Sequence, residues 1–378
     1  MPRTVVAAYA RSPFTLARKG ALARVRPDDL AAQVVRGLVE RSGVKPDDIE
    51  DLLLGCAFPE GEQGLNLGRL VGLMAGLPRS VGGATVNRFC GSSMTSVHVA
   101  AGSIAMGAGE VFVCAGVESM SRVPMMGFNP MPHPAYAKSN PELYIGMGDT
   151  AENVAQRWQI PRVEQEAFAL RSQERAAAAV AAGRLAEEIV LITGLDGVVD
   201  VDGCPRPETT SDGLAALKPA FSAEGVVTAG TSSPLTDGAS ALLVCSEAYA
   251  EKAGLPVLAY VRSVAVRGCD PEIMGIGPVG ASRRALERAG ISASDLDVVE
   301  LNEAFASQAI ACIRDLGLDP ERVNLDGGAI ALGHPLGATG ARIVGKAASL
   351  LKREKGRYAL ATQCIGGGQG IATVLEAA

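Results

Sequence analysis

Apolar and polar positions follow two different periods along this chain of 378 residues. Short apolar runs rich in β-branched residues predict buried strands, at 4–9, 51–58, 82–89 and 110–117. Segments of helical character lie between them, at 27–42, 61–76 and 92–107. Helix signals frame the first of these segments, because Pro27 and two acidic residues open it and Gly43 follows its end. This alternation of strands and helices predicts a layered α/β core.

The same pattern recurs in the last third of the chain. The sequence ERSGVKPDDIED at 40–51 aligns with ERAGISASDLDV at 287–298, and the two share a Glu-Arg pair, a glycine, aliphatic positions and an aspartate. The elements after each copy also correspond in order: a strand, then a glycine-rich turn leading into a helix (324–351), then an apolar strand and loop (358–375). Two similar halves would pack about a pseudo-twofold axis, so Cys90 is expected to face loops of the second half.

Residues 119–235 break this pattern. A Met- and Pro-rich loop is followed by a helical Ala/Arg/Glu segment at 161–182 and a turn-rich stretch. We therefore predict an N-terminal half from 1–118 and 236–256, an inserted loop domain at 119–235, and a C-terminal half at 257–378. Such an insertion is suited to form a lid or a binding attachment, and the alternative is an element that serves only stability or oligomer contacts.

Composition narrows the classes of function. The chain is 48% hydrophobic and carries a net charge of −6, so it has no overall positive field for nucleic acid or an anionic membrane surface. No apolar run is long enough to span a bilayer, and the first residues lack the apolar core of a secretory signal. The eight cysteines form neither a CxxC pair nor a cluster with zinc-ligand spacing, which favours free thiols in a reducing cytoplasm and no metal site.

Cys90 is the first candidate for chemistry. It lies in VNRFCGSS, where an apolar strand is expected to turn into a helix of small residues. Unpaired amides and the positive end of the helix dipole at such a turn favour thiolate over thiol, which makes a cysteine nucleophilic. The alternative is a small buried thiol that only packs, and the turn alone leaves both interpretations open.

The three histidines have different settings. His334 lies between Gly333 and Pro335 in a glycine-rich turn, and a rigid turn of this kind suits an imidazole that acts as a base. His98 falls within the helix after Cys90 and is interpreted as a packing residue, and His133 lies in the Pro-rich loop and is interpreted as exposed.

Two further stretches carry polar groups at expected strand ends. Cys364 precedes a glycine-rich loop whose bare amides could approach an oxyanion, with a simple tight turn as the alternative. Asn302 lies in LNEAF, where the alternative is an asparagine that caps the following helix. The stretch VTAGTSSPLTDGAS at 227–240 offers small residues and hydroxyls, which suggests a narrow channel for a slender ligand.

Together these stretches resemble the thiolases, the acetyl-CoA C-acyltransferases. The resemblance covers nearly the whole chain in order, and its motifs are NRFCGSS, VESMS, MGDTAENVA, TAGTSSPLTDGA, NEAF, GGAIALGHPLGATG and CIGGGQG. RPETT at 206–210 and GCDPEIMGIGPV at 268–279 look more like bacterial 3-ketoacyl-CoA thiolases of fatty acid β-oxidation than like biosynthetic acetoacetyl-CoA enzymes. In the latter a histidine commonly precedes the Met-Gly of the 147 motif, where this chain has Gly146.

The resemblance implies a layered αβαβα core of two similar halves and a ping-pong acyl transfer. Cys90 would lose its proton to His334, attack the ketone carbon of a 3-ketoacyl-CoA and become acylated. Cys364 would protonate the departing acetyl-CoA carbanion and later deprotonate the incoming CoA. One oxyanion hole would use the amides of Cys90 and Gly366, and the other would use His334 with a water held by Asn302.

The resemblance also implies the binding residues and partners. CoA would be a substrate rather than a cofactor, and its contacts would come from Ser233, Met147, Phe221, Ala229, Met274, Ala304 and Phe305, with Arg206 and Lys218 near the adenine or phosphates. A homodimer or homotetramer is implied, and association with a multifunctional β-oxidation subunit stays open. The alternative activity is the condensation of two acetyl-CoA to acetoacetyl-CoA. A non-catalytic relative would have lost part of the catalytic set, and Asn302 argues against decarboxylating ketosynthases, which usually have a histidine there.

Overall fold

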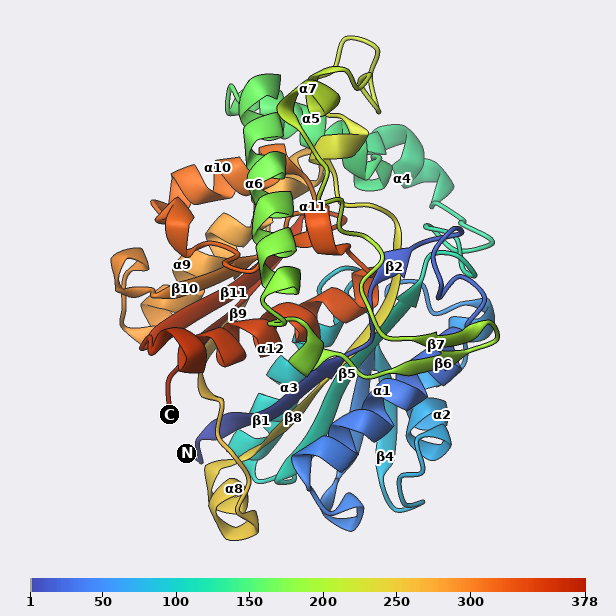
Figure 1. Cartoon of the computed structure of the whole chain (residues 1–378), viewed down its shortest axis with the longest axis vertical. Helices are drawn as coiled ribbons and strands as arrows, with labels where there is room; N and C mark the ends of the chain where they lie inside the picture. Colours follow the sequence, from blue (N-terminus) through green and yellow to red (C-terminus); the bar gives the residue numbers. More distant parts are fainter. Residues whose placement is uncertain (1) are drawn as a thin grey trace.

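The fold is centred on two antiparallel strands, β1 (Thr4–Arg11) and β9 (Ala259–Gly268), in a computed structural model that describes residues 2–378. From β1 the sheet continues through β8, β5, β3 and β4, and from β9 through β12, β11 and β10 (Figure 1). The remaining strand bounds are β2 Thr15–Leu16, β3 Asp51–Gly55, β4 Gly82–Val86, β5 Val111–Ser119, β8 Thr236–Ser246, β10 Val298–Leu301, β11 Tyr358–Ile365 and β12 Gln369–Glu376.

The two sides of the sheet have the same pairing directions. β1–β8 and β8–β5 are antiparallel and β5–β3 is parallel, while β9–β12 and β12–β11 are antiparallel and β11–β10 is parallel. The second side therefore repeats the first, apart from the additional edge strand β4. The predicted α/β core of two similar halves is confirmed, and the repeated sequence at 40–51 and 287–298 leads into corresponding strands β3 and β10.

Helices lie on the outer faces of the two halves of the sheet and between the halves, which gives five layers. α1 (Pro27–Ser42) and α2 (Leu67–Met74) pack on the outer face of the N-terminal half, and α9 (Gly277–Ala289) and α10 (Ala306–Leu316) pack on the outer face of the other half. α3 (Ser92–Met106) and α12 (Leu336–Glu354) share one apolar cluster with strands of both halves. The order of layers is therefore αβαβα.

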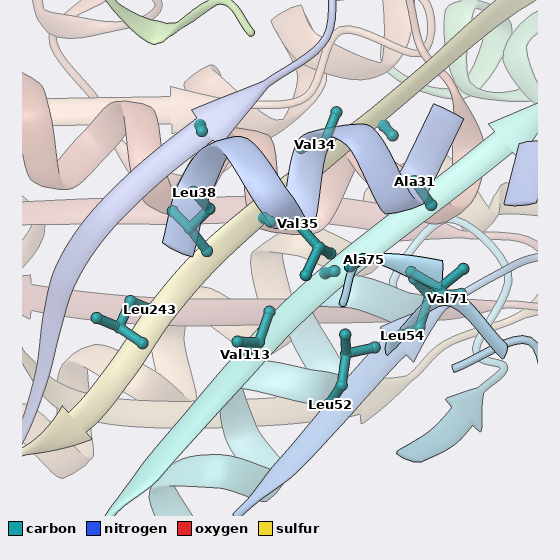
Figure 2. Packing of buried hydrophobic residues seen from close by; sticks show 14 of the residues in the cluster. Ala31, Val34, Val35, Leu38, Leu52, Leu54, Val71, Ala75, Val113 and Leu243 are labelled. Carbon is teal, nitrogen blue, oxygen red and sulfur yellow. The ribbon is translucent and has the colours of Figure 1, made fainter. Parts of the chain in front are cut away.

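The α1 helix shows why the outer layers form. It is amphipathic, and its buried side chains face those of β3, β5, β8 and α2, as Figure 2 shows for Ala31, Val34, Val35, Leu38, Leu52, Leu54, Val71, Ala75, Val113 and Leu243. Gly43 ends the helix with φ of +73° and donates its N–H to the Val39 carbonyl at 3.2 Å. The predicted bounds of this helix agree with the structure.

The predicted helix over 61–76 is wrong in its first part. A 3₁₀ turn at Gly61–Gln63 comes first, and α2 begins only after Asn66, whose Oδ1 accepts the Arg69 N–H at 3.2 Å. Leu65 has φ of +59°, a conformation that breaks a right-handed helix. The N-cap at Asn66 therefore makes the helix begin later than the periodic pattern of leucines suggested.

The inserted segment leaves the sheet after β5 and returns at β8. It contains α4 (Pro134–Ser139), α5 (Met147–Arg157), α6 (Arg162–Ala181), the hairpin of β6 (Ile192–Gly194) and β7 (Gly197–Val199), and α7 (Ser211–Ala215). Two short helices lie outside the insertion and the layers: α8 (Glu247–Ala253) and α11 (Ala329–Leu332). The division into units at residues 118, 235 and 256 stays a prediction.

Buried ion pairs fasten the insertion to both halves. Arg11 on β1 bonds Asp202 at 2.6 Å and Glu188 at 2.8 Å, and Lys346 on α12 bonds the same Glu188 at 3.2 Å and Asp326 at 2.7 Å. All of these side chains are shielded from solvent. Removing one member would leave an uncompensated buried charge, so the network fixes where the insertion sits.

Candidate active site

One cavity of about 430 Å³ collects most of the predicted site residues from both halves and the insertion. These residues are Cys90, Met147, Phe221, Ser233, Met274, Ala304, Phe305, His334 and Cys364. Among the described residues that line it, Asp149 is the one carboxylate, and no lysine or arginine takes part. The cavity therefore suits an uncharged, slender part of a ligand, and any phosphates must lie outside it.

A sharp turn presents Cys90 to this cavity. Phe89 has φ of +44°, an uncommon conformation for a bulky residue. Its N–H donates to Asn87 Oδ1 at 2.9 Å, and the Ser92 hydroxyl donates to the Phe89 carbonyl at 2.6 Å and accepts the Arg88 N–H at 2.9 Å. These bonds hold a strained backbone in place immediately before the first turn of α3.

The Cys90 thiol is neutral in the free protein at neutral pH. Burial raises its pKa to about 11, although the amides of Gly366 and of Cys90 itself approach the sulfur and act in the opposite direction. The nearby Glu118 carboxylate also raises this pKa. The two amides act in the direction expected from the turn, but desolvation outweighs them. A base must remove the proton during the reaction.

We expect the alkylation of Cys90 by iodoacetamide to accelerate about tenfold per unit between pH 8 and pH 10, since the thiolate fraction grows as the pH approaches a raised pKa. Peptide mapping by mass spectrometry at fixed times would measure the rate at this one cysteine. A rate that is already maximal at pH 8 would contradict the neutral thiol.

His334 is held as a neutral base. Its Nδ1 lies 2.6 Å from the Thr339 hydroxyl, and that hydroxyl donates its own hydrogen to the Pro335 carbonyl at 2.9 Å. Nδ1 must therefore carry the ring proton, which leaves Nε2 unprotonated and able to accept a hydrogen bond or a proton. Burial, with a smaller contribution from the Arg342 charge, lowers the pKa of His334 to about 3. The backbone N–H of His334 donates to Thr236 Oγ1 at 3.0 Å and fixes the turn.

Asn302 faces the free nitrogen of that imidazole. Its Nδ2 lies 3.4 Å from His334 Nε2, and its backbone N–H donates to the Thr362 carbonyl at 3.0 Å. Its buried Oδ1 has no hydrogen-bond partner among residues 2–378. A buried acceptor of this kind is normally satisfied by a ligand or a water, so the pair can bind a polar group.

Cys364 and Gly366 approach Cys90 from the end of β11. Burial raises the pKa of the Cys364 thiol well above its usual value, and the charge of an ionised Cys90 would raise it further. The Gln363 side-chain amide donates to the Cys90 carbonyl and joins the two turns. Cys364 packs with Ala304, Phe305 and the other members of one apolar cluster, so it holds its proton in a dry site.

The far wall of the cavity comes from the stretches predicted to bind CoA. The Ser233 N–H donates to the Ala304 carbonyl at 3.0 Å, and the rings of Phe221 and Phe305 meet edge to face with centroids 5.9 Å apart. Met147, at the start of α5, belongs to the same apolar cluster. Residues from separate stretches of the sequence therefore lie side by side in this wall.

Of the residues predicted to bind CoA, three do not line the cavity: Arg206, Lys218 and Ala229. The predicted catalytic residues Asn302 and Gly366 are not part of its lining either. Arg206 points to α6 and α11, because its N–H donates to Gln173 Oε1 at 2.9 Å and its guanidinium lies 3.5 Å from the Ile330 carbonyl. Lys218 and Ala229 are exposed. Contacts of these three residues with CoA stay predictions.

Other residues of the site were not singled out from the sequence. Met120, Met125, Leu235 and Leu336 line the cavity, and Met120 and Leu336 pack directly with Cys90. The buried Glu118 carboxylate accepts N–H groups from Ala57 at 2.8 Å and Gly337 at 2.9 Å, and it joins the turns of the two halves. An acidic residue at the end of an otherwise apolar strand was the only signal for it.

The structure adds two negative findings. Residues 2–378 contain no group of three or more His, Cys, Asp or Glu side chains arranged to hold a metal ion. No helix in this part of the chain is long and apolar enough to cross a membrane.

Comparison with known proteins places the chain in a family. Residues 4–248 match the thiolase N-terminal domain and residues 255–377 match the thiolase C-terminal domain, so the chain belongs to the thiolase family. Similar proteins include the 3-ketoacyl-CoA thiolase of Bacillus subtilis (strain 168), with 47% identity over the whole of both chains. The enzymes of the same name from Pseudoalteromonas translucida (strain TAC 125) and Shewanella sp. (strain MR-7) share 49% and 48% identity over at least 99% of each chain.

Proposed function

We propose that the protein is a 3-ketoacyl-CoA thiolase that transfers an acyl group between Cys90 and CoA. The observation that carries this proposal is the convergence of Cys90, His334 and Cys364 in one apolar cavity, with the Gly366 amide at the Cys90 sulfur. Relatives that are 47–49% identical over the full chain and are named 3-ketoacyl-CoA thiolase support it.

In the first half-reaction, His334 Nε2 takes the proton of Cys90, and the sulfur attacks the ketone carbon of the substrate. The unprotonated Nε2 supports this role, because a neutral imidazole can accept a proton and an imidazolium cannot. The carbon–carbon bond then breaks, the acyl group stays on sulfur, and Cys364 gives its proton to the departing acetyl-CoA carbanion. Cys364 keeps that proton until this step because it is fully buried.

In the second half-reaction, the Cys364 thiolate takes the proton of an incoming CoA thiol. The CoA sulfur attacks the thioester, and the shortened acyl-CoA leaves as Cys90 recovers its proton from His334. Negative charge on the reacting oxygen would be stabilised by the amides of Cys90 and Gly366 in one step and by His334 with a water held by Asn302 in the other. The reaction as written needs no metal or redox cofactor, and CoA is a substrate.

The chain length of the substrate separates this proposal from the alternative, condensation of two acetyl-CoA. Met120, Met125, Leu235 and Leu336 give the Cys90 side of the cavity an apolar wall, and each buried methylene contributes about 0.8 kcal/mol. We therefore expect kcat/KM for thiolysis of 3-ketooctanoyl-CoA to equal or exceed that for acetoacetyl-CoA. The assay follows loss of the 3-ketoacyl-CoA absorbance. Cleavage of acetoacetyl-CoA alone would favour the alternative.

We also propose a homodimer. Edge strand β4 has a free side, and exposed apolar residues lie on the neighbouring α2 and α3 and on the Cys90 turn: Leu70, Leu73, Met74, Phe89, Val99 and Met106. Monomers rarely expose so many apolar side chains in one region, and a second copy related by a twofold axis would cover them. The Met-rich part of the insertion, with Met126 and Met131 exposed, is a candidate contact for a tetramer.

We expect sedimentation equilibrium to give at least twice the monomer mass. Val99→Glu should shift the protein toward monomer, because it places a charge on this apolar surface. Glu40→Gln, on an exposed part of α1, serves as the control. A monomeric wild-type protein would contradict the homodimer. Co-purification from the source cells would show whether a multifunctional β-oxidation subunit also binds.

We infer a cytoplasmic location. All eight cysteines are unpaired, which is typical of proteins in a reducing compartment. Fractionation of the source cells would test this inference, and recovery from an oxidising compartment would contradict it.

A further inference from the structure

A buried carboxylate next to Asn302 is not accounted for by the proposed reaction. Glu303 is 2% exposed, and its Oε2 accepts the Ser172 hydroxyl at 2.6 Å and the Ile330 N–H at 3.2 Å. Its Oε1 accepts Asn324 Nδ2 at 2.8 Å. No cation forms a salt bridge with it within residues 2–378. Neutral donors on three different segments therefore surround this carboxylate, and each of its oxygens accepts at least one hydrogen bond.

These segments carry the polar groups of the active site. Ile330 lies on α11, four residues before His334, and Glu303 directly follows Asn302. The bond from Ile330 to Glu303 therefore links the segment that carries His334 to the segment that carries Asn302. Asn324 secures the other side of Asn302, since it accepts the Leu301 N–H at 2.9 Å and donates to the Leu301 carbonyl at 2.8 Å.

Gly328 packs closely against the Glu303 carboxylate. A Cβ at Gly328 would overlap the Glu303 carboxylate, so only glycine permits this approach. The Gly328 N–H donates to the Ser172 hydroxyl at 3.1 Å, and the neighbouring Gln173 donates to the Ile330 carbonyl at 3.3 Å. Helix α6 of the insertion thus supports both active-site segments through two consecutive polar residues.

We propose that Glu303 is a positioning residue that sets the Asn302 amide against Nε2 of His334. The inference rests on the proposed function, in which Asn302 and His334 act together on the reacting oxygen. Asn302 and His334 lie on two different segments, and their side-chain nitrogens are 3.4 Å apart. Among the side chains next to these two residues, Glu303 is the one that joins the segments directly, through its bond with the Ile330 N–H. Ser172 extends this support to the insertion, so that correct docking of α6 is required for the amide to reach its place.

Glu303→Gln tests the proposal, because a glutamine has almost the same shape but must turn an NH₂ group toward one set of donors. Removing an oxyanion-hole donor outright costs roughly 10²–10³ in kcat, and a displaced amide should cost less. We expect kcat to fall about tenfold to hundredfold, while KM for CoA stays within about twofold because the CoA wall is untouched.

A double-mutant cycle separates positioning from a general loss of stability. In an Asn302→Ala background, Glu303→Gln should lower kcat by less than about threefold, because the amide it positions is gone. The melting temperature should fall by the same amount in both backgrounds. Losses of kcat that multiply in the double variant would overturn the proposal.

Two further variants keep the test decisive. If Glu303→Gln does not fold, Ser172→Ala removes a single donor and should show the same non-additivity with Asn302→Ala at a smaller size. Asp28→Asn is the matched control, a buried carboxylate that bonds Arg26 at the start of α1, outside the cavity and away from the insertion, and it should lower the melting temperature without lowering kcat. A wild-type protein without thiolysis would overturn the proposed function itself, whereas an active wild type with multiplicative losses would overturn only the positioning role.

Discussion

Cys90→Ala is expected to abolish acyl-enzyme formation and thiolysis together. Alanine keeps the Cβ but has no sulfur to attack the substrate, and the Cys364 thiol has a pKa raised well above its usual value, so it holds its proton and does not replace the nucleophile. Loss of a nucleophile that acts in concert with a base typically lowers kcat by about 10⁴–10⁶. Intact-mass spectrometry after incubation with acetyl-CoA would show an acetyl adduct on the wild-type protein and none on the variant.

The matched control for this change is Cys114→Ala. Cys114 is also fully buried, but it packs in the middle layer of the core, away from the cavity. The Cys114→Ala variant should have a lower free energy of unfolding and an unchanged kcat for thiolysis. The assignment of Cys90 would be falsified if Cys90→Ala retained near-normal thiolysis, or if the adduct mapped to another cysteine.

Cys364→Ala is expected to separate the two halves of the reaction. Cys90 and His334 remain, so acetyl-CoA should still acylate Cys90. Without the second thiol, no group protonates the acetyl-CoA carbanion or deprotonates the incoming CoA, and general acid–base steps of this kind contribute about 10²–10⁴ in rate. Turnover should fall by roughly that factor while the acyl-enzyme accumulates, which rapid-quench mass spectrometry would detect.

Cys312→Ala provides the comparison for that experiment. Cys312 is buried in the core of the C-terminal half and its sulfur bonds the Gly275 carbonyl, so its loss disturbs packing but not proton transfer. Equal turnover by Cys364→Ala and Cys312→Ala would remove Cys364 from the proton-handling role. Failure of Cys364→Ala to become acylated would instead place that thiol in the first step.

The sequence predicted the parts of the fold that depend on local pattern and repetition. The matching stretches at 40–51 and 287–298 predicted two similar halves, and strands β3 and β10 occupy corresponding places in the sheet. The Cys90 turn was predicted because a strand, small residues and a helix follow one another within a short span. These features depend on neighbours in the sequence, and periodicity reports them well.

Properties that depend on distant partners could not be predicted. The protonation state of Cys90 could not be derived from its turn, because its burial arises from residues such as Met120 and Leu336, which the sequence does not place beside it. The role of Glu303 was equally hidden, since Ser172 lies 131 positions away on the inserted helix. Long-range packing sets the dielectric and the hydrogen bonds of a site, and single-sequence reasoning has no access to either.

The place of β1 at the centre of the sheet has a consequence for biosynthesis. This strand leaves the ribosome long before its neighbours β8 and β9, which begin only at Thr236 and Ala259. The N-terminal half therefore cannot close its sheet while the insertion is still being translated, and β1 keeps two unpaired edges for most of synthesis. Such late, long-range closure slows folding and exposes strand edges to aggregation, so the nascent chain has a built-in need for chaperone protection.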